Sequence, residues 1–98
     1  MKILPEPIFY EWDKGNIEKN LIKHNVTSQE TEEPFDNKPN SIIRDEKHSL
    51  KERRYLLWGT TDKGRKLSII FTIRKNKIRI ISVRDMNKKE RKAYEKAI

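Results

Sequence analysis

Arginines interrupt an apolar run near the C-terminus of the sequence, and their spacing suggests a site for an anion. The stretch Ile78–Arg84 (IRIISVR) is rich in Ile and Val and predicts a β-strand. Arg79 and Arg84 have opposite parity in it, so they are expected on opposite faces. A strand that only fills a core does not need guanidinium groups, whereas guanidinium groups bind phosphate oxygens in pairs and stay charged.

A second arginine is expected beside the first. A two-residue turn at Lys75–Asn76 would place Thr72 opposite Arg79, so that Arg74 and Arg79 become diagonal neighbours. Like charges so placed repel by up to about 1 kcal/mol, and an anion between them would remove that cost. This register puts Ser68, Ile70, Thr72, Arg74, Arg79, Ile81 and Val83 on one face. The core face receives Leu67, Ile69, Phe71, Ile73, Ile78 and Ile80, with Arg84 at its end; a bulge would shift these parities.

The remaining elements follow from periodicity and capping residues. Strands are expected at Ile8–Trp12, Ser41–Arg44, Arg53–Thr60, Arg65–Arg74 and Lys77–Arg84. A first helix runs from the cap Asp13 to about His24, with an apolar stripe of Ile17, Leu21 and His24. Thr27 and Glu30 form a capping box for a second helix that ends near Pro34, and a third helix covers Asn87–Ala97. The 98 residues are predicted to form one domain, 1–98.

Charge is distributed unevenly along the chain. Of a net charge of +8, residues 1–49 contribute 7 − 10 = −3 and residues 50–98 contribute 16 − 5 = +11. A basic, strand-rich half favours nucleic acid as the partner. The chain has no Cys and two His, which with no tight carboxylate cluster does not favour a metal site, and no cofactor is expected. No signal-peptide or membrane-spanning pattern is visible, so a cytoplasmic location is expected.

Three segments in order resemble the BrnT toxins, the ribonuclease half of BrnT–BrnA toxin–antitoxin pairs. They are FYEWDKGNIEKNLIKHNV, DEKHSLKERRYLLWGTTDKGRKL and TIRKNKIRIISVRDMNKKERKAY, and together they reach from about Phe9 to Tyr94. The sequence departs from the family at Asn25, where Gly is usual, and in the second helix, which contains Pro34. The resemblance implies an α+β, RelE-like fold. It has a four-stranded antiparallel sheet, two N-terminal helices on one face and a C-terminal helix.

The same resemblance implies metal-independent RNA cleavage on the other face of the sheet. Such cleavage needs a base for the 2′-OH, positive charge for the transition state and an acid for the 5′-oxygen. Arg79 and Arg74 are expected to grip the scissile phosphate, together with Arg54, the family's arginine on the preceding strand. His48 and Glu52 are the alternative bases. The resemblance also implies a BrnA-like antitoxin that neutralises the toxin and joins it in repressing their operon, with DNA contacted only through that complex.

Several other cations have both a functional and a structural interpretation. Lys19 and Lys23 lie four apart on the first helix and either grip RNA backbone or form a solvated helix face. Arg53 is a further candidate for RNA binding, and the parity of Arg54 next to it depends on the turn length at TDKG. Arg84 either binds RNA or pairs with an acidic group and anchors the C-terminal helix. Two other functions remain open for the whole chain: a basic nucleic-acid-binding module without turnover, and an inactive toxin that only binds its antitoxin.

Overall fold

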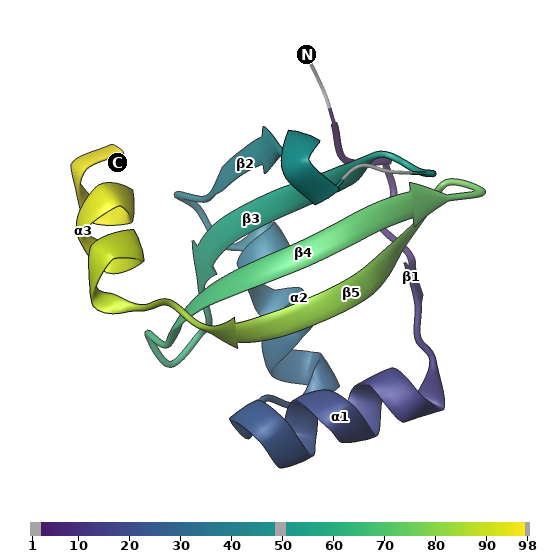
Figure 1. The fold of residues 1–98 in the computed structure, drawn as a ribbon, viewed down its shortest axis with the longest axis horizontal. Coiled ribbons are helices and arrows are strands. Elements are labelled where there is room, and N and C mark those ends of the chain that lie inside the picture. Colours follow the sequence, from purple (N-terminus) through teal and green to yellow (C-terminus); the bar gives the residue numbers. More distant parts are fainter. Residues whose placement is uncertain (1–2, 49–50, 98) are drawn as a thin grey trace.

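The computed structural model describes residues 3–48 and 51–97, and the side chain of His48 lies outside that description. In this part of the chain, one five-stranded sheet has the order β1-β5-β4-β3-β2 (Figure 1). The strands are β1 (Tyr10–Glu11), β2 (Ser41–Arg44), β3 (Arg54–Thr60), β4 (Lys66–Arg74) and β5 (Lys77–Asp85). The helices are α1 (Lys14–His24), α2 (Ser28–Asp36) and α3 (Lys88–Ala97), with a 3-10 turn η1 (Glu46–His48).

The sheet is mixed, so the expectation of four antiparallel strands is wrong. Strands β2 to β5 are antiparallel to their neighbours, but β1 joins β5 in parallel, with Tyr10 opposite Ile78 and Glu11 opposite Arg79. The N–H of Ile78 donates to the carbonyl of Phe9 over 2.8 Å. A short apolar run shows that a strand forms but not which edge it joins, and β1 joins a strand more than sixty residues away in sequence.

The hairpin of β4 and β5 has the predicted register as far as Phe71. Lys75 and Asn76 both have positive φ, 49° and 66°, as a two-residue hairpin turn requires, and Thr72 lies opposite Arg79. The register then shifts between Ile70 and Phe71, whose partners are Ser82 and Ile80. A β-bulge therefore leaves Ile81 without a directly opposite partner.

The bulge corrects two expectations about β5. Val83 is 1% exposed in the core, not on the opposite face, and Arg84 lies opposite Ser68 on that opposite face, not on the core face. Without the extra residue, a guanidinium group would point toward the core and a valine toward solvent. Because burying a charge is far more costly than burying an alkyl group, the bulged register is favoured.

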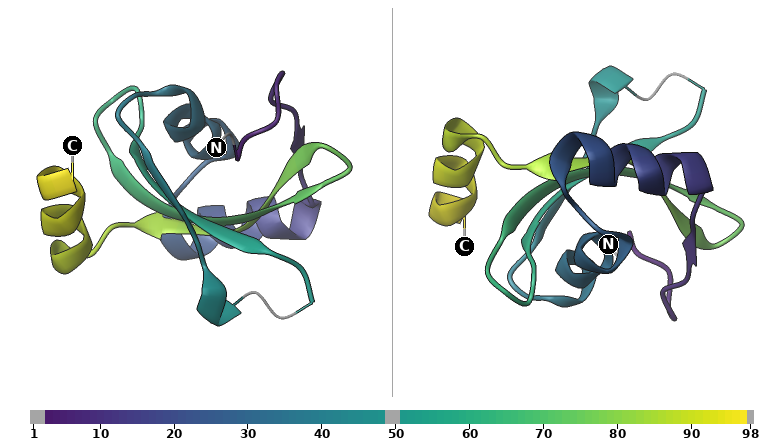
Figure 2. Two further views of the ribbon diagram at one scale, coloured as in Figure 1. Left: turned by 90° about the horizontal axis from the view of Figure 1, so that it is seen from above. Right: turned by 90° about the horizontal axis from the view of Figure 1, so that it is seen from below.

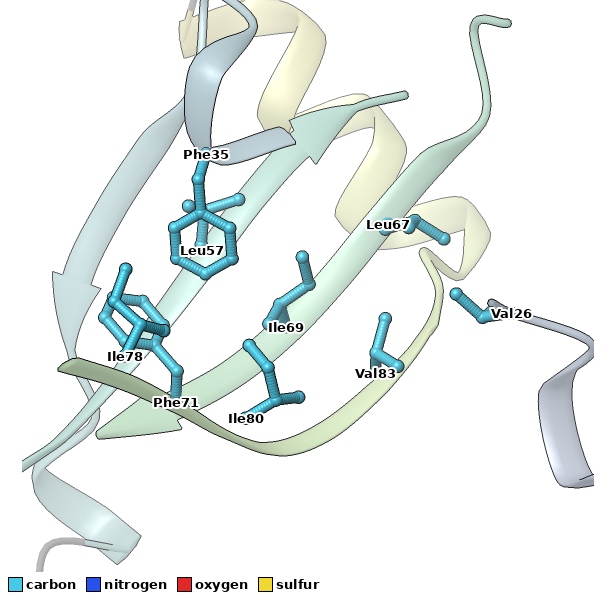
Figure 3. Packing of buried hydrophobic residues seen from close by; sticks show 9 residues of the cluster. All are labelled: Val26, Phe35, Leu57, Leu67, Ile69, Phe71, Ile78, Ile80 and Val83. Atoms are coloured by element: carbon cyan, nitrogen blue, oxygen red, sulfur yellow. The ribbon is translucent and has the colours of Figure 1, made fainter. Parts of the chain in front are cut away.

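The core lies between the sheet and α2 (Figure 3). Phe35 of α2 packs edge-to-face on Phe71 of β4, with ring centroids 5.1 Å apart. The other members of the cluster are Val26, Leu57, Leu67, Ile69, Ile78, Ile80 and Val83. The helix also comes very close to β3, because a Cβ built on Gly59 would lie 2.8 Å from the Cβ of Pro34.

The first helix does not bury the predicted stripe. Leu21 is 46% exposed and His24 is exposed, whereas Asn20 is 2% exposed. Helix α1 lies along β5, and the side-chain amide of Asn16 donates to the carbonyl of Ile80. Strand β1 pairs with β5 only at Tyr10 and Glu11, and the Asn16 amide binds a β5 carbonyl just beyond that pairing.

Capping at the other helix ends follows the sequence, with one exception. Asn25 is left-handed after α1, Thr27 and Glu30 form the capping box of α2, and Asn87 and Glu90 cap α3 reciprocally. Helix α2, however, contains Pro34 and ends at Asp36, whereas Pro34 was expected to end the helix or follow it. Its last carbonyls are satisfied from outside, because the Asn40 amide donates to the carbonyl of Pro34 over 3.0 Å.

Helix α3 lies at one end of the sheet, and Tyr94 is its buried residue there. Tyr94 is 1% exposed, its hydroxyl donates to the carbonyl of Pro39 over 2.7 Å, and it lies 3.0 Å from the hydroxyl of Thr60. None of the helices described has the length and apolar character needed to span a membrane.

Candidate nucleic-acid interface

The sheet has one face turned away from α2, called the open face below. Figure 2 shows α2 on one side of the sheet and η1 on the other, which is the side of the open face. The registers of β3, β4 and β5 place these residues on it: Arg54, Leu56, Trp58, Ser68, Ile70, Thr72, Arg74, Arg79, Ser82 and Arg84.

Two arginines flank a small residue in one row across the open face. Arg54 lies opposite Thr72, and Thr72 lies opposite Arg79. Thr72 is 1% exposed, and its hydroxyl donates to the carbonyl of Arg53 over 2.8 Å. Arg74 is the diagonal neighbour of Arg79, as the sequence predicts.

Glu52 joins these arginines from the loop before β3. Its two carboxylate oxygens accept hydrogen bonds of 2.9 Å from Nε and Nη2 of Arg74. Those bonds and the charge of Arg74, followed by the charges of Arg54 and Arg79, hold the pKa of Glu52 below its usual value. The structure thus brings together four of the five residues predicted for catalysis, named below the arginine cluster: Glu52, Arg54, Arg74 and Arg79. The side chain of the fifth, His48, lies outside the described part of the chain.

Acidic residues of β1 and of the α1 N-cap lie beside Arg79. Its Nη1 is 3.4 Å from Oε1 of Glu11, and its Nη2 is 3.8 Å from Oδ2 of Asp13. Sequence reasoning missed both carboxylates, because the parallel pairing of β1 with β5 was not foreseen. Lys19 also belongs here, since it lines a shallow hollow between α1 and β5 with Asp13 and Arg79.

The other predicted binding residues lie apart from this hollow. Lys23 is exposed on α1, and Arg53 is exposed just before β3. Arg84 lies at the other end of the open face, where Nη1 and Nη2 donate to Glu90 of α3 over 2.6 and 2.9 Å. This pair raises the pKa of Arg84 and lowers that of Glu90. Arg84 therefore anchors α3, as the structural alternative predicted.

Arg65 holds the surrounding elements together, a role that the sequence did not reveal. Its Nη groups donate to the carbonyls of His24 and Asn25, each over 2.8 Å, at the end of α1. The same side chain binds Asp85 over 2.7 and 3.0 Å and Glu30 over 3.3 Å. Arg65 thereby lowers the pKa of Asp85, and it adds to the effect of the Thr27 N–H in lowering that of Glu30.

The described residues contain no group of three or more His, Asp or Glu placed to hold a metal ion. What the open face does contain is a set of fixed guanidinium groups beside carboxylates. Guanidinium groups bind phosphate oxygens, and ionised carboxylates accept protons or orient cations.

Fold and site together define a class of protein: a small α+β chain with a cluster of arginines on one face of its sheet. The family model described as "ribonuclease toxin, BrnT, of type II toxin-antitoxin system" matches residues 12–90. Because this match covers most of the chain, the protein belongs to the BrnT family. It is a ribonuclease toxin of a type II toxin–antitoxin system, with RNA as target and an antitoxin as partner. A search of curated proteins found no significant match.

Proposed function

We propose that the chain cleaves RNA on the open face without a metal ion, and that the arginine cluster is the centre of the site. The observation that carries this proposal is the row of Arg54, Thr72 and Arg79, with Arg74 beside it. A phosphodiester over Thr72 would have guanidinium groups on both sides. In that position they stabilise the extra charge of the transition state, which is often the largest single contribution to catalysis.

The reaction is an internal transfer of the phosphoryl group. The 2′-oxygen attacks the phosphorus, a base removes the 2′ proton, and the bond from phosphorus to the 5′-oxygen breaks. The leaving 5′-oxygen takes a proton from an acid. The products are a 2′,3′-cyclic phosphate and a 5′-hydroxyl, and all atoms balance without water or metal.

The structure distinguishes the candidate bases by their contacts. Both oxygens of Glu52 are bound by Arg74 and its pKa is lowered, so Glu52 is a weak base that orients a guanidinium group. Glu11 has a longer contact of 3.4 Å with Arg79, and its side chain is 45% exposed. We therefore assign the base to Glu11, with His48 as the alternative predicted from sequence.

The partner proposals rest on the family. We propose that the antitoxin is similar to BrnA, that it neutralises the toxin, and that the pair represses its own operon with DNA contacted through the antitoxin. A RelE-like fold, a single domain over residues 1–98 and a cytoplasmic location belong to the same proposal. The net charge of +8 supports binding of either RNA or an acidic region of an antitoxin.

The test is to incubate the purified chain with short RNAs in EDTA, with and without ribosomes, and to identify the new ends. Cleavage in EDTA that leaves cyclic phosphate and 5′-hydroxyl ends is the expected result. Cleavage that needs an added metal ion, or that leaves 5′-phosphate ends, would contradict the mechanism. Binding without cleavage under either condition would instead favour the non-catalytic binding module.

A further inference from the structure

A row of apolar side chains lies next to the arginine cluster on the open face. Ile43 of β2 lies opposite Leu56 of β3, and Leu56 lies opposite Ile70 of β4. Ile43 is 55% exposed, and Leu56 and Ile70 are each half-buried. The apolar row, meaning Ile43, Leu56 and Ile70, therefore lies on the open face, away from α2.

On β3 and β4, the apolar row lies two positions along the strand from the arginine row. Leu56 is two positions from Arg54, and Ile70 is two positions from Thr72. At the rise of a β-strand this is about 6–7 Å. That is close to the separation between a phosphate and the base of its own nucleotide, so a nucleotide bound at the arginines would have its base over the apolar row.

A tryptophan bounds the apolar row on its other side. Trp58 lies opposite Ser68, and its indole N–H donates to the Ser68 hydroxyl over 3.2 Å. That bond satisfies the polar atom of the half-buried ring, so the part that remains accessible is apolar. Aromatic and aliphatic side chains of this kind hold nucleobases by their faces in proteins that bind single strands.

We propose that the apolar row, bounded by Trp58, is a nucleobase subsite for the nucleotide next to the scissile phosphate of a single-stranded RNA. The proposal deepens the proposed function and rests on it, because the arginine cluster fixes where the phosphate lies. A base suits this surface because it is flat and mostly uncharged, and because its phosphate is attracted to the adjacent guanidinium groups. The side chains make no base-specific set of hydrogen bonds, so the subsite requires a base without selecting one strongly.

The experiment combines substrates that lack one base with matched Ile→Thr variants. The substrates are DNA strands with one ribonucleotide, so that only one bond can be cleaved by the 2′-OH. Each is made intact and with an abasic sugar on the 5′ or the 3′ side of that bond. The variants are Ile43→Thr and Ile70→Thr, which keep a β-branched side chain in a strand. Ile22→Thr is the control, because Ile22 is 83% exposed on α1.

For the wild type, one of the two abasic substitutions is expected to lower kcat/KM by tenfold or more. Ile43→Thr and Ile70→Thr should slow the intact substrate several-fold and leave the rate on that abasic substrate nearly unchanged. Ile22→Thr should change neither rate. The subsite would be overturned if Ile43→Thr and Ile70→Thr slowed cleavage of the intact and the abasic substrate equally. It would also be overturned if removing either base left the wild-type kcat/KM unchanged.

Binding of uncleavable 2′-O-methyl strands separates this proposal from the nuclease itself. If nothing is cleaved but affinity shows the same dependence on the base and on Ile70, the nuclease mechanism fails and the subsite stands. If neither rate nor affinity depends on the base, the subsite is overturned. Ile43→Thr or Ile70→Thr could instead keep the wild-type dependence on the base and no longer bind the co-expressed antitoxin. That result would assign the apolar row to the antitoxin interface and would also overturn the subsite.

Discussion

At the scale of single residues, the open face is organised by arginines that each have a different set of partners. Arg74 is held by both oxygens of Glu52, Arg79 has longer contacts with Glu11 and Asp13, and Arg84 is committed to Glu90. An arginine with longer contacts to its carboxylate partners can exchange them for a phosphate more easily. We therefore assign the largest catalytic role to Arg79 and a structural role to Arg84.

Glu52 of the arginine cluster and Glu11 beside it should behave differently when their charge is removed. Glu11→Gln is expected to lower cleavage by about 10²–10⁴, because the base is lost. Glu52→Gln should lower the rate less, because it only loosens Arg74. The measurement is kcat/KM at pH 7 for both variants. A Glu11→Gln protein that cleaves RNA as fast as the wild type would return the base to His48.

Arg65 should make the stability of the fold sensitive to acid. Its carboxylate partners Glu30 and Asp85 have lowered pKa values in the folded state, so the stabilisation they give is complete above their unfolded values of about 4. It is lost as the pH falls through the lower folded values. Arg65→Met should cost about 1–2 kcal/mol at pH 7, after allowance for the exposed Asp85.

Urea unfolding of the wild type and Arg65→Met at pH 7, 5 and 3 checks this expectation. The difference in unfolding free energy between the wild type and Arg65→Met, called the gap here, should narrow as the pH falls toward 3. Protonated carboxyl groups no longer gain stability from the guanidinium group. Lys63→Ala, in the exposed turn before β4, is the control and should track the wild type. A gap that stays constant with pH would show that Arg65 acts through the carbonyl groups of α1 alone.

At the scale of elements, local signals predicted most helices and turns but not how the elements meet. The Lys75–Asn76 turn and the alternation in β4 were enough for the hairpin register. The bulge at Ile81 was not predictable, because Ile80, Ile81 and Val83 offer apolar residues in either parity. The buried face of α1 was also missed: Asn16 bonds the edge of β5, and Asn20 is buried where the sequence pattern predicted Leu21.

The contact of α2 with β3 makes glycine necessary at one position. In Gly59→Ala the new Cβ would lie 2.8 Å from the Cβ of Pro34 and 3.2 Å from its carbonyl oxygen. The clash should cost about 1–3 kcal/mol of unfolding free energy. Gly15→Ala is the matched control, because its Cβ would meet only Asp13 Oδ1 at 3.4 Å and alanine favours a helix. Urea unfolding should show opposite signs for the two variants; two equal effects would contradict the close packing of α2 on β3.

At the scale of the whole molecule, the charge distribution was enough to predict a polyanion as the partner, whereas the sequence pattern did not predict all the residues of the site. The excess of positive charge in residues 50–98 pointed to a polyanion, and the open face built from this half carries the arginine cluster. The carboxylates that complete the cluster come partly from β1, in the acidic half. Their position depends on a parallel pairing between distant segments, which no local pattern encodes.

Affinity for RNA should therefore depend steeply on salt. With uncleavable 2′-O-methyl RNA, the logarithm of the binding constant should fall linearly with the logarithm of salt concentration, by about 0.7 for each phosphate contacted. Arg79→Ala should reduce that slope by about one contact, whereas Ile22→Thr should leave it unchanged. Affinity that does not respond to salt would remove the electrostatic basis of the proposed interface.

The central claim is that guanidinium groups on the open face drive cleavage, and single-turnover cleavage by Arg79→Ala tests it most directly. Arg79→Lys and Lys63→Ala are measured beside it, with circular dichroism and urea unfolding to show that each variant is folded. Arg79→Ala should be slower than the wild type by about 10²–10³, with Arg79→Lys between the two and Lys63→Ala unchanged. A folded Arg79→Ala protein that cleaves RNA at the wild-type rate would place the reaction elsewhere on the molecule.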